Sequence, residues 1–497
     1  MRLILGGPGC GKTTRLLGIM EEELARGVAP ERLAFVSFTR KAVAEATERA
    51  CERFNLTPRA LPYFRTVHSL AYRLLGVARG EIMQHRNWAE LGAALGYEFS
   101  RHAVLEDGLA PAGRERGDLL RFLDGLARAR CVGAEEQLRE SREEVTPQEF
   151  ARYRAALAGY KREAVMMDFT DLLERYVAEG APAPVEVAII DEAQDLSRLQ
   201  WRMLKRAFGG VARRYVGGDD DQAIFRWSGA DIDTFLALRG EREVLGTTHR
   251  LPRHLYSYSQ LLVSRLSQRY EKSAKPRAEA GALHRIATFE QAPVAAGGTW
   301  MLLARNSFYL APIKEWLHGE GLPYATAAGS SINPGHLRAI GAWERLRRGE
   351  AVTVAAAREV YEYLPGVARG FKALPGLEDE APVTLPELRA RYGAPATSAP
   401  WHDALAAIPL RDRTYYRAVK RRGEPLGRTP RIYVGTIHSV KGGEAENVVL
   451  LPNLTQRTWD DYTRDADDEH RTFYVGATRA KQALYIAAPT TTRSYTL

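Results

Sequence analysis

Short apolar runs that end in glycine or acidic residues recur along the chain, and each predicts a buried strand that leads into a loop. Leu3–Leu5 runs into a pair of glycines, and Val185–Ile190 runs into Asp191. Leu33–Phe38 is a further run of this kind, and apolar residues at helical spacing follow it. Strands that alternate with helices are typical of an α/β fold with parallel sheets, in which ligands bind at the carboxyl ends of the strands. We therefore expect the chemistry of this chain at those strand ends.

Two stretches break this alternation and predict insertions. Residues 81–164 are charged, with helical periodicity and no clear buried strand. Residues 342–430 are irregular, contain several prolines, and lead into a strongly basic run at residues 411–431. The pattern therefore predicts two α/β domains, each with an insertion that is mainly helical. The first domain comprises residues 1–80 and 165–240 with insertion 81–164, and the second comprises 241–341 and 431–497 with insertion 342–430.

Composition narrows the class of protein without fixing its partner. Lys and Arg number 70 against 61 Asp and Glu, which gives a net charge of +9 and a pI near 9.3. This surplus fits a polyanionic partner, although a basic pI is also common in proteins that bind no nucleic acid. Cys10, Cys51 and Cys131 are far apart, which argues against a zinc site, an iron–sulfur cluster or a disulfide framework. Because no apolar run approaches the roughly 18–20 residues of a membrane span, and no signal-peptide pattern precedes the first motif, we expect a cytoplasmic protein without a membrane partner.

The first glycine-rich loop has the pattern of a phosphate-binding loop. Residues 6–13 read G-G-P-G-C-G-K-T and match G-x-x-x-x-G-K-[ST] at every fixed position. Between a strand and a helix, the N–H groups of such a loop can surround a triphosphate, Lys12 can reach the outer phosphates, and the Thr13 hydroxyl can bind Mg²⁺. We therefore predict ATP and Mg²⁺ as cofactors. The predicted nucleotide-binding residues here are Gly6, Gly9, Gly11, Lys12, Thr13, Thr14 and Arg15.

An acidic pair follows the apolar run that ends at residue 190. Asp191 can hold Mg²⁺, and Glu192 can accept a proton from the attacking water. Alone, an acidic strand end is more often a solvated loop. A phosphate loop on a neighbouring strand makes the catalytic interpretation the better one.

Seven segments in order resemble the motifs of the superfamily 1A helicases typified by UvrD, PcrA and Rep. They are the phosphate loop, T-V-H-S at 66–69, D-F-T-D-L-L at 168–173, D-E-A-Q-D at 191–195, G-D-D-D-Q-A-I-F-R-W-S-G-A at 218–230, T-I-H-S-V-K-G-G-E at 436–444 and Y-V-G-A-T-R-A at 474–480. The resemblance implies two RecA-like P-loop motor domains with parallel sheets. It also implies an ATP-dependent DNA helicase that moves 3′ to 5′ on single-stranded DNA and unwinds duplex.

The resemblance assigns further residues to ATP. Gln222 would sense the γ-phosphate and couple it to DNA, and Arg250 and Arg479 would be arginine fingers supplied by the second lobe. Such guanidinium groups stabilise the charge that develops on the transferred phosphoryl oxygens. His249 would stack on the base, and Glu444 would contact the ribose.

The same motifs supply expected DNA contacts. Phe225 and Trp227 lie two residues apart in a loop, where aromatic rings can stack on bases of any sequence. Core packing is the alternative for Phe225, and a structural hydrogen bond is the alternative for His68 and His438. The basic run at 411–431 is either a grip on duplex phosphates or a solvated basic face. The expected single-strand contacts are Phe38, Arg40, His68, Phe225, Trp227, Asn306, Thr436 and His438.

Several positions depart from the family pattern. Only five residues precede Gly6, too few for the usual segment that reads adenine, so nucleoside triphosphates other than ATP stay open as substrates. Residues 248–250 read T-H-R where N-Y-R is usual, and Ser228 stands where arginine is common. The chain ends 18 residues after Arg479, so neither a nuclease domain nor a long partner-binding tail is expected.

Two further functions remain open from the sequence. One is a single-stranded-DNA translocase that remodels protein–DNA complexes without processive unwinding, and the other is a nucleotide-gated DNA-binding switch. Single-stranded DNA and junctions of single-stranded with duplex DNA are the expected partners of a motor. A protein partner or self-association for unwinding is left undetermined.

Overall fold

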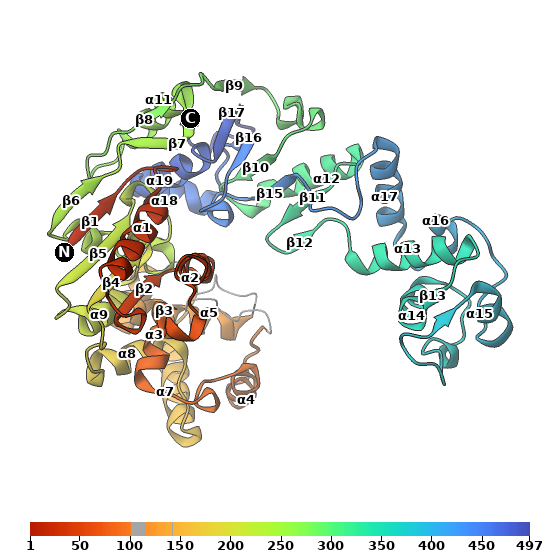
Figure 1. Cartoon of the computed structure of the whole chain (residues 1–497), viewed down its shortest axis with the longest axis horizontal. Coiled ribbons are helices and arrows are strands. Elements are labelled where there is room, and N and C mark those ends of the chain that lie inside the picture. Colours follow the sequence, from red (N-terminus) through yellow and green to blue (C-terminus); the bar gives the residue numbers. More distant parts are fainter. Residues whose placement is uncertain (101–114, 142) are drawn as a thin grey trace. The chain divides into compact units, whose positions relative to one another are not determined.

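The computed structural model describes residues 1–100, 115–141 and 143–497, and these form two compact units, each built on one large sheet (Figure 1). Unit 1 consists of Met1–Ala280 and Asp465–Tyr474, and unit 2 consists of Gly281–Arg464 and Val475–Leu497. The predicted α/β class with parallel sheets is confirmed.

Six parallel strands form the sheet of unit 1. They are β1 (Arg2–Leu5), β2 (Leu33–Ser37), β3 (Tyr63–Thr66), β4 (Val187–Asp191), β5 (Arg213–Gly218) and β6 (Glu241–Val244). Their order across the sheet is β3-β2-β4-β5-β1-β6. Because the strands are parallel, the loops that follow β1, β4 and β5 all leave from the same edge of the sheet.

Both faces of this sheet are covered by helices. The covering helices are α1 (Lys12–Ala25), α2 (Arg40–Phe54), α3 (Val67–Leu75), α8 (Phe169–Glu179) and α9 (Arg198–Phe208). Ile4 packs in the layer that contains α1 and α2, whereas its neighbours Leu3 and Leu5 pack in the layer that contains α3, α8 and α9. Successive strand residues point to opposite faces, so burial of both faces explains why the strands are continuous apolar runs.

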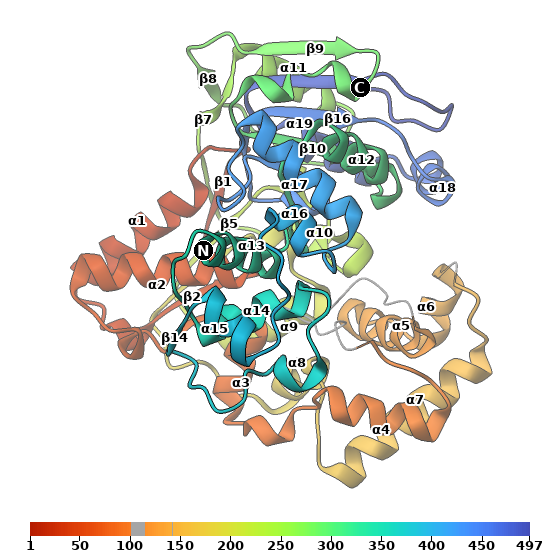
Figure 2. The same cartoon turned by 90° about the vertical axis from the view of Figure 1, so that its right-hand side faces the viewer.

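A helical subdomain interrupts unit 1 between α3 and α8. It contains α4 (His85–Leu95), α5 (Arg116–Arg130), α6 (Ala134–Glu140) and α7 (Pro147–Ala164), which lie side by side in Figure 2. Its own core includes Met83, Trp88, Leu120, Phe150 and Tyr153. Residues 101–114 and 142 of the predicted insertion lie outside the described residues.

Segments from beyond the first sheet also pack in unit 1. They are β7 (Thr247–Pro252), α11 (Arg253–Val263), β8 (Lys275–Arg277) and the part of α19 (Asp467–Ala477) that ends at Tyr474. β7 pairs with β8 in a separate two-stranded sheet. The second motor domain is predicted to begin at residue 241, whereas in the structure residues 241–280 and 465–474 pack with unit 1.

Unit 2 contains a seven-stranded sheet. Its strands are β9 (Ala282–Ile286), β10 (Trp300–Ala304), β11 (Tyr324–Thr326), β12 (Gly329–Ser330), β15 (Ile432–Thr436), β16 (Ala445–Leu451) and β17 (Ala480–Ala487). They are arranged in the order β12-β11-β15-β10-β16-β17-β9, and the pairs are parallel except for β11 with β12. The helices α12 (Ala311–Glu320) and α18 (Gln456–Arg464) follow strands of this unit.

A second subdomain interrupts unit 2 between β12 and β15. It contains the helices α13 (Pro334–Arg347), α14 (Val354–Tyr363), α15 (Leu385–Arg391), α16 (Trp401–Ala404) and α17 (Leu410–Arg422), with the short pair β13 (Val352–Thr353) and β14 (Pro382–Val383). Trp343, Tyr361, Trp401 and Tyr416 form part of its separate core. Pro334 opens α13, a position at which proline favours a helix rather than breaking it. Among the described residues of the whole chain, no helix is both long enough and apolar enough to cross a membrane.

Candidate nucleotide and nucleic-acid site

The predicted phosphate loop connects β1 to α1 in unit 1. Gly9 and Gly11 have φ angles of 71° and 79°, which side chains adopt rarely. A Cβ on Gly9 would also lie 2.4 Å from Cβ of Arg250, so this position requires glycine on two grounds. Lys12 is buried, and its Nζ donates hydrogen bonds to the carbonyls of Gly6 at 2.8 Å and Gly7 at 3.4 Å. The loop therefore holds its lysine among its own carbonyls.

The two residues after Thr13 differ in their surroundings. The Thr14 side chain is exposed at the start of α1. Arg15 Nε donates to Glu243 Oε1 on β6 at 2.7 Å, and this hydrogen bond raises the pKa of the guanidinium. Arg15 is thus bound to Glu243 on β6, the outermost strand on one side of the sheet.

A hydroxyl and a carboxylate meet beside the loop. Thr13 Oγ1 donates to Asp191 Oδ2 at 3.0 Å. Asp191 is fully buried at the end of β4, and burial together with the charge of Glu192 raises its pKa to about 7. Two hard oxygen donors at one point suit Mg²⁺, which prefers oxygen ligands. The expectation that this carboxylate lies on a strand next to the phosphate loop is wrong, because β5 lies between β4 and β1.

A chain of hydrogen bonds joins Glu192 to Gln222. Glu192 Oε2 accepts a hydrogen bond from Gln194 Nε2 at 2.5 Å, and Gln194 Oε1 accepts one from the backbone N–H of Asp219 at 2.9 Å. Asp219 Oδ2 in turn accepts from Gln222 Nε2 at 2.6 Å. The predicted base and the predicted phosphate sensor are therefore held in one network. Gln194 is absent from the predicted site residues, although it lies within the D-E-A-Q-D segment.

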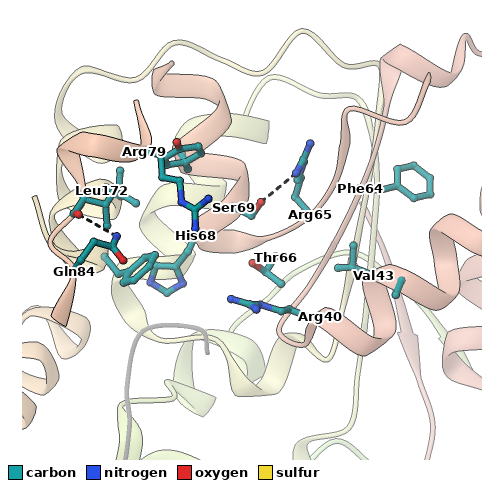
Figure 3. A pocket seen from close by; sticks show the side chains of 14 residues that line it. Arg40, Val43, Phe64, Arg65, Thr66, His68, Ser69, Arg79, Gln84 and Leu172 are labelled. Carbon is teal, nitrogen blue, oxygen red and sulfur yellow. Dashed lines mark hydrogen bonds between the residues drawn. The ribbon is translucent and has the colours of Figure 1, made fainter. Parts of the chain in front are cut away.

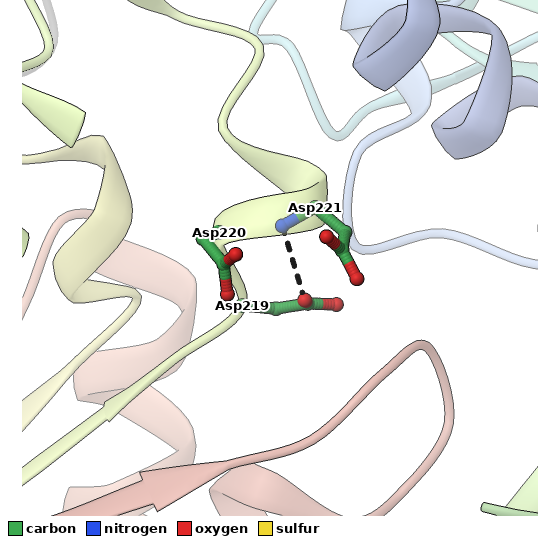
Figure 4. Close-up of side chains that lie close together, drawn as sticks. All are labelled: Asp219, Asp220 and Asp221. Atoms are coloured by element: carbon green, nitrogen blue, oxygen red, sulfur yellow. Dashed lines mark hydrogen bonds between the residues drawn. The ribbon is translucent and has the colours of Figure 1, made fainter. Parts of the chain in front are cut away.

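The three aspartates after β5 form a buried acidic cluster (Figure 4). Lys272 Nζ lies 3.2 Å from Asp219 Oδ1 and 3.2 Å from Asp221 Oδ2, and it also pairs with Asp220. Arg269 binds both oxygens of Asp221, at 2.8 and 2.6 Å. Burial lowers the pKa of Lys272, but the three carboxylates outweigh it and the pKa is raised. The acidic cluster is thus an ion-pair network with two cations, and sequence reasoning missed both because they lie in no motif.

β7 holds the phosphate loop through its backbone and one hydroxyl. Thr248 Oγ1 donates to the Pro8 carbonyl at 2.8 Å, and the His249 N–H donates to the Gly9 carbonyl at 2.9 Å. The next residue, Arg250, is half-buried against Gly9. The family resemblance implies that Arg250 comes from the second lobe, whereas it packs in unit 1 beside the loop. The reason is that β7 binds the loop directly.

The other predicted residues for ATP lie in unit 2. Arg479 is fully buried, and its guanidinium donates to the carbonyls of Val475 at 2.9 Å and Gly443 at 3.1 Å. Glu444 is exposed, and its carboxylate accepts from Lys481 Nζ at 3.0 Å. The backbone of the 436–444 segment therefore positions Arg479 within unit 2.

Three aromatic rings form a row on unit 1. Phe38 and Phe225 stack with ring centroids 5.9 Å apart, and Phe225 lies 6.5 Å from Trp227. Phe225 is half-buried between its neighbours rather than in the core, and Trp227 is 40% exposed. Arg226, between the two aromatic residues, pairs with Asp468 at 3.1 Å. In this row, called the aromatic row below, the middle ring, Phe225, lies three residues after Gln222 in the sequence.

A pocket of about 590 Å³ opens on the same unit (Figure 3). Arg40, His68 and Arg79 reach into it from three different elements, and Phe169 and Gln84 are among the other residues that line it. Burial lowers the pKa of His68 to about 4, so the ring is neutral at neutral pH. Among the described residues, His68 Nδ1 has no hydrogen-bond partner. Phe169 meets the His68 ring edge-on at 6.3 Å, and sequence reasoning did not assign it to the site.

The predicted DNA contacts of unit 2 lie on adjacent strands. β10 pairs with β15, so the segments that carry Asn306 and Thr436 leave the sheet side by side. Asn306 Nδ2 donates to Thr458 Oγ1 at 2.9 Å, and its Oδ1 accepts from the Thr455 N–H at 3.1 Å. Thr436 and His438 are half-buried. The amide of Asn306 therefore also holds the start of α18.

Two protein families match this chain. The UvrD/REP helicase N-terminal domain matches residues 1–242, and the UvrD-like helicase C-terminal domain matches residues 419–491. The first match covers the sheet of unit 1 and most of the predicted ATP site, but not His249, Arg250, Glu444 or Arg479. The second covers most strands of unit 2 that carry predicted motifs.

Individual relatives are similar over parts of their length. YjcD of Bacillus subtilis is 24% identical over 295 residues, which are 54% of this chain and 37% of YjcD. The ATP-dependent DNA helicase PcrA of Bacillus subtilis is 28% identical over 261 residues, 47% of this chain and 33% of PcrA. The RecBCD enzyme subunit RecB of Mycolicibacterium smegmatis is 35% identical over 108 residues, 19% of this chain and 10% of RecB. The matched segments thus span 37% or less of these relatives.

Proposed function

Because the chain belongs to the UvrD/PcrA-like family of superfamily 1 helicases, we propose that it is an ATP-driven motor on DNA. It moves 3′ to 5′ along single-stranded DNA and unwinds duplex. The observation that carries this proposal is the continuity of the segment after β5. Within it, Gln222 is hydrogen-bonded into the network of Glu192, and Phe225 and Trp227 of the aromatic row follow it closely in the sequence. A change at the terminal phosphate can therefore reach the DNA platform through one short segment.

The proposed ATP site uses the phosphate loop and the ends of β4 and β5. The N–H groups of the loop and Lys12 bind the phosphates. Thr13 and Asp191 hold Mg²⁺, which when bound neutralises charge on the phosphate oxygens. Glu192 accepts the proton of the attacking water, and the Gln222 amide contacts the terminal phosphate.

Other groups complete the proposed nucleotide site. Arg250 lies beside the phosphate loop and stabilises the charge that develops during phosphoryl transfer, and Arg479 has the same proposed role. His249 and Glu444 contact the base and the ribose. Gly6, Gly9 and Gly11 let the loop wrap the phosphates, and Thr14 and Arg15 follow at the start of α1.

The proposed single-strand site on unit 1 has two parts. The aromatic row offers faces for base stacking, which tolerates any sequence. The pocket of Figure 3 offers Arg40 and Arg79 to phosphate groups, with neutral His68 as a hydrogen-bonding group and Phe169 as a ring. On unit 2, Asn306, Thr436 and His438 continue the proposed contacts. The partners are single-stranded DNA and its junctions with duplex.

The test compares ATP hydrolysis by the wild type with that by Glu192→Gln, with and without single-stranded DNA. We expect strong stimulation by DNA in the wild type and loss of hydrolysis in the variant at unchanged nucleotide binding. Glu186→Gln, an exposed glutamate just before β4, is the control and should match the wild type. Strand displacement from 3′-tailed but not 5′-tailed duplexes would support the polarity. Hydrolysis that neither DNA nor RNA stimulates would contradict the motor.

A further inference from the structure

We propose that Lys272 is a positioning residue of ATP hydrolysis, whose ammonium holds the Asp219 carboxylate in the orientation that fixes the amide of Gln222. This inference rests on the proposed function, in which Gln222 contacts the terminal phosphate. Lys272 lies between α11 and β8, outside every motif that the sequence displays. Its role follows from what its side chain touches.

The two oxygens of Asp219 have different partners. Oδ1 lies 3.2 Å from Lys272 Nζ, and Oδ2 accepts from Gln222 Nε2 at 2.6 Å. The side chain of Asp219 is 0% exposed and that of Lys272 is 4% exposed, so bulk water cannot replace either partner. Oδ1 also accepts from the backbone N–H of Asp221, at the longer distance of 3.3 Å. Without the ammonium, the carboxylate is therefore held less firmly against rotation about its own axis. Rotation would move the acceptor away from Gln222 and weaken the hydrogen bond that orients its amide.

Lys272 also balances the charge of the acidic cluster. Three carboxylates are buried there, and Lys272 pairs with all of them, while Arg269 neutralises Asp221 from its other side. Burial raises the pKa of Asp219, but Lys272 is the largest of the influences that hold it below its usual value. An ionised Asp219 is the form that accepts two hydrogen bonds. Charge balance and orientation are separate effects, and variants can separate them.

The lysine is close to the phosphate loop as well as to Gln222. Lys272 lines a cavity of about 20 Å³ together with Gly7, Pro8 and Cys10 of that loop. A cavity of this size holds at most one water molecule. Lys272 therefore lies close to the phosphate loop as well as to the acidic cluster, where its ammonium can orient the group that binds Gln222.

The cluster also fastens two segments that are distant in sequence. Arg471 Nε donates to the Asp220 carbonyl at 3.1 Å, and its Nη2 donates to the Gln268 carbonyl at 3.1 Å. The chain continues from unit 1 into unit 2 shortly after each segment, at Ala280 and at Tyr474. The segment that contains Asp220 and Gln222 is thus linked, through Arg471, to the stretches of chain that precede both crossings from unit 1 to unit 2.

The experiment compares Lys272→Met with the wild type by DNA-stimulated ATP hydrolysis, binding of a fluorescent ADP analogue and Tm. Misplacing a catalytic group by about 1 Å can cost roughly 100-fold in rate, so we expect kcat to fall at least about tenfold. KM for ATP and ADP binding should stay within about twofold, because the Lys272 ammonium is engaged by the three carboxylates of the acidic cluster. Lys272→Arg should recover part of kcat. Lys275→Met, an exposed lysine three residues further on, is the matched control and should change nothing.

A second variant separates positioning from stability. Lys272→Met combined with Asp220→Asn keeps the formal charge of the cluster at −1, because three carboxylates with two cations become two carboxylates with one. We expect Tm to recover in this double variant while kcat remains low, since Asp219 still lacks its ammonium. Recovery of kcat together with Tm would overturn the inference and leave Lys272 a structural role. So would a wild-type kcat in Lys272→Met alone. A wild type without nucleic-acid-stimulated hydrolysis would instead overturn the proposed function, and this inference with it.

Discussion

At the scale of single residues, His68 links stability to pH. Its pKa is lowered from 6.5 to about 4 because the ring is buried. Between these values the unfolded chain binds the proton and the folded chain does not, so folding stability rises with pH. The contribution is complete above pH 6.5 and is lost as the pH falls toward 4, by up to about 3 kcal/mol.

His68→Gln removes this proton linkage. We expect the Tm of the wild type to fall more steeply between pH 7 and pH 4.5 than the Tm of the variant. His254→Gln, on the exposed side of α11, is the control and should follow the wild type. Parallel Tm profiles for His68→Gln and the wild type would show that the ring titrates normally in the folded protein.

Trp227 carries the second prediction at this scale. Its ring is 40% exposed at the end of the aromatic row, and base stacking on such a ring contributes about 1–3 kcal/mol. Trp227→Ala should therefore weaken binding of single-stranded DNA roughly 5-fold to 150-fold in fluorescence anisotropy. ATP hydrolysis without DNA should not change, and Trp227→Phe should retain most of the affinity. Phe371→Ala, where the ring is 38% exposed in the insertion of unit 2, should bind DNA as the wild type does.

Residues of the candidate site that lie close together in the sequence could be predicted, whereas contacts that depend on tertiary packing could not. Residues 6–11 form one loop, and Lys12 and Thr13 open α1 directly after it, so their spacing alone predicts their geometry. Gln194 lies in a motif, but its hydrogen bonds depend on side-chain orientations that spacing does not encode. Lys272 is 53 residues from Asp219, and the pairing results from tertiary packing. A single lysine in a chain with 70 Lys and Arg gives no signal of its own.

At the scale of elements, β7 stabilises the phosphate loop. Thr248 Oγ1 donates to the Pro8 carbonyl at 2.8 Å and accepts from the backbone N–H groups of Arg250 and Leu251, each at 3.3 Å. Among the described residues, the carbonyl groups of the loop accept side-chain hydrogen bonds from Lys12 within the motif and from Thr248 on β7. The Thr248 side chain, together with the backbone N–H of His249, therefore connects β7 to the phosphate loop.

Thr248→Val tests this connection with nearly the same side-chain volume. Removing each hydrogen bond costs about 0.5–1.5 kcal/mol, so we expect a lower Tm and a KM for ATP raised severalfold. Thr247→Val changes the exposed neighbour on the same strand and should leave both values unchanged. If Thr248→Val keeps the wild-type KM, the loop does not depend on β7 for its conformation.

The elements themselves were predictable to different degrees. The apolar runs at 3–5 and 33–38 correspond to β1 and β2 within a residue or two, because strands buried on both faces leave a continuous apolar signal. The order β4-β5-β1 could not be read from such runs, since pairing is set by packing between distant segments. The stretch at 342–430 looked irregular because proline opens or precedes helices there, as it does in α15 and α17.

At the scale of the whole molecule, the two insertions have hydrophobic cores of their own and can vary without disturbing the sheets. The basic run predicted at 411–431 lies largely on α17 in the insertion of unit 2. Its buried side is formed by Tyr415, Tyr416 and Val419, whereas Arg417 and Arg421 are exposed. A helix that anchors itself by aromatic packing and exposes its cations offers a fixed surface to phosphate groups. We therefore expect α17 to bind the duplex part of a tailed DNA.

Reversal of charge on α17 tests whether this helix binds duplex DNA while other elements bind the single strand. The triple variant Arg417→Glu, Lys420→Glu and Arg421→Glu should bind a tailed duplex roughly tenfold more weakly. It should also reduce the slope of log affinity against log salt by about 0.9 for each phosphate that the protein no longer neutralises. Affinity for single-stranded DNA and its stimulation of ATP hydrolysis should not change, because the residues proposed to bind the single strand lie on other elements.

The control must change the net charge equally within the same insertion. Arg369→Glu, Lys372→Glu and Arg391→Glu do so at exposed positions away from α17. If the two triple variants lose duplex affinity to the same extent, the effect comes from net charge alone and the basic side of α17 is a solvated face. If only the α17 variant loses it, the insertion of unit 2 holds the duplex while the sheet edges hold the single strand. Separate sites for duplex and single strand would explain why these basic side chains lie on a helix of the insertion and not at the ends of the sheet strands.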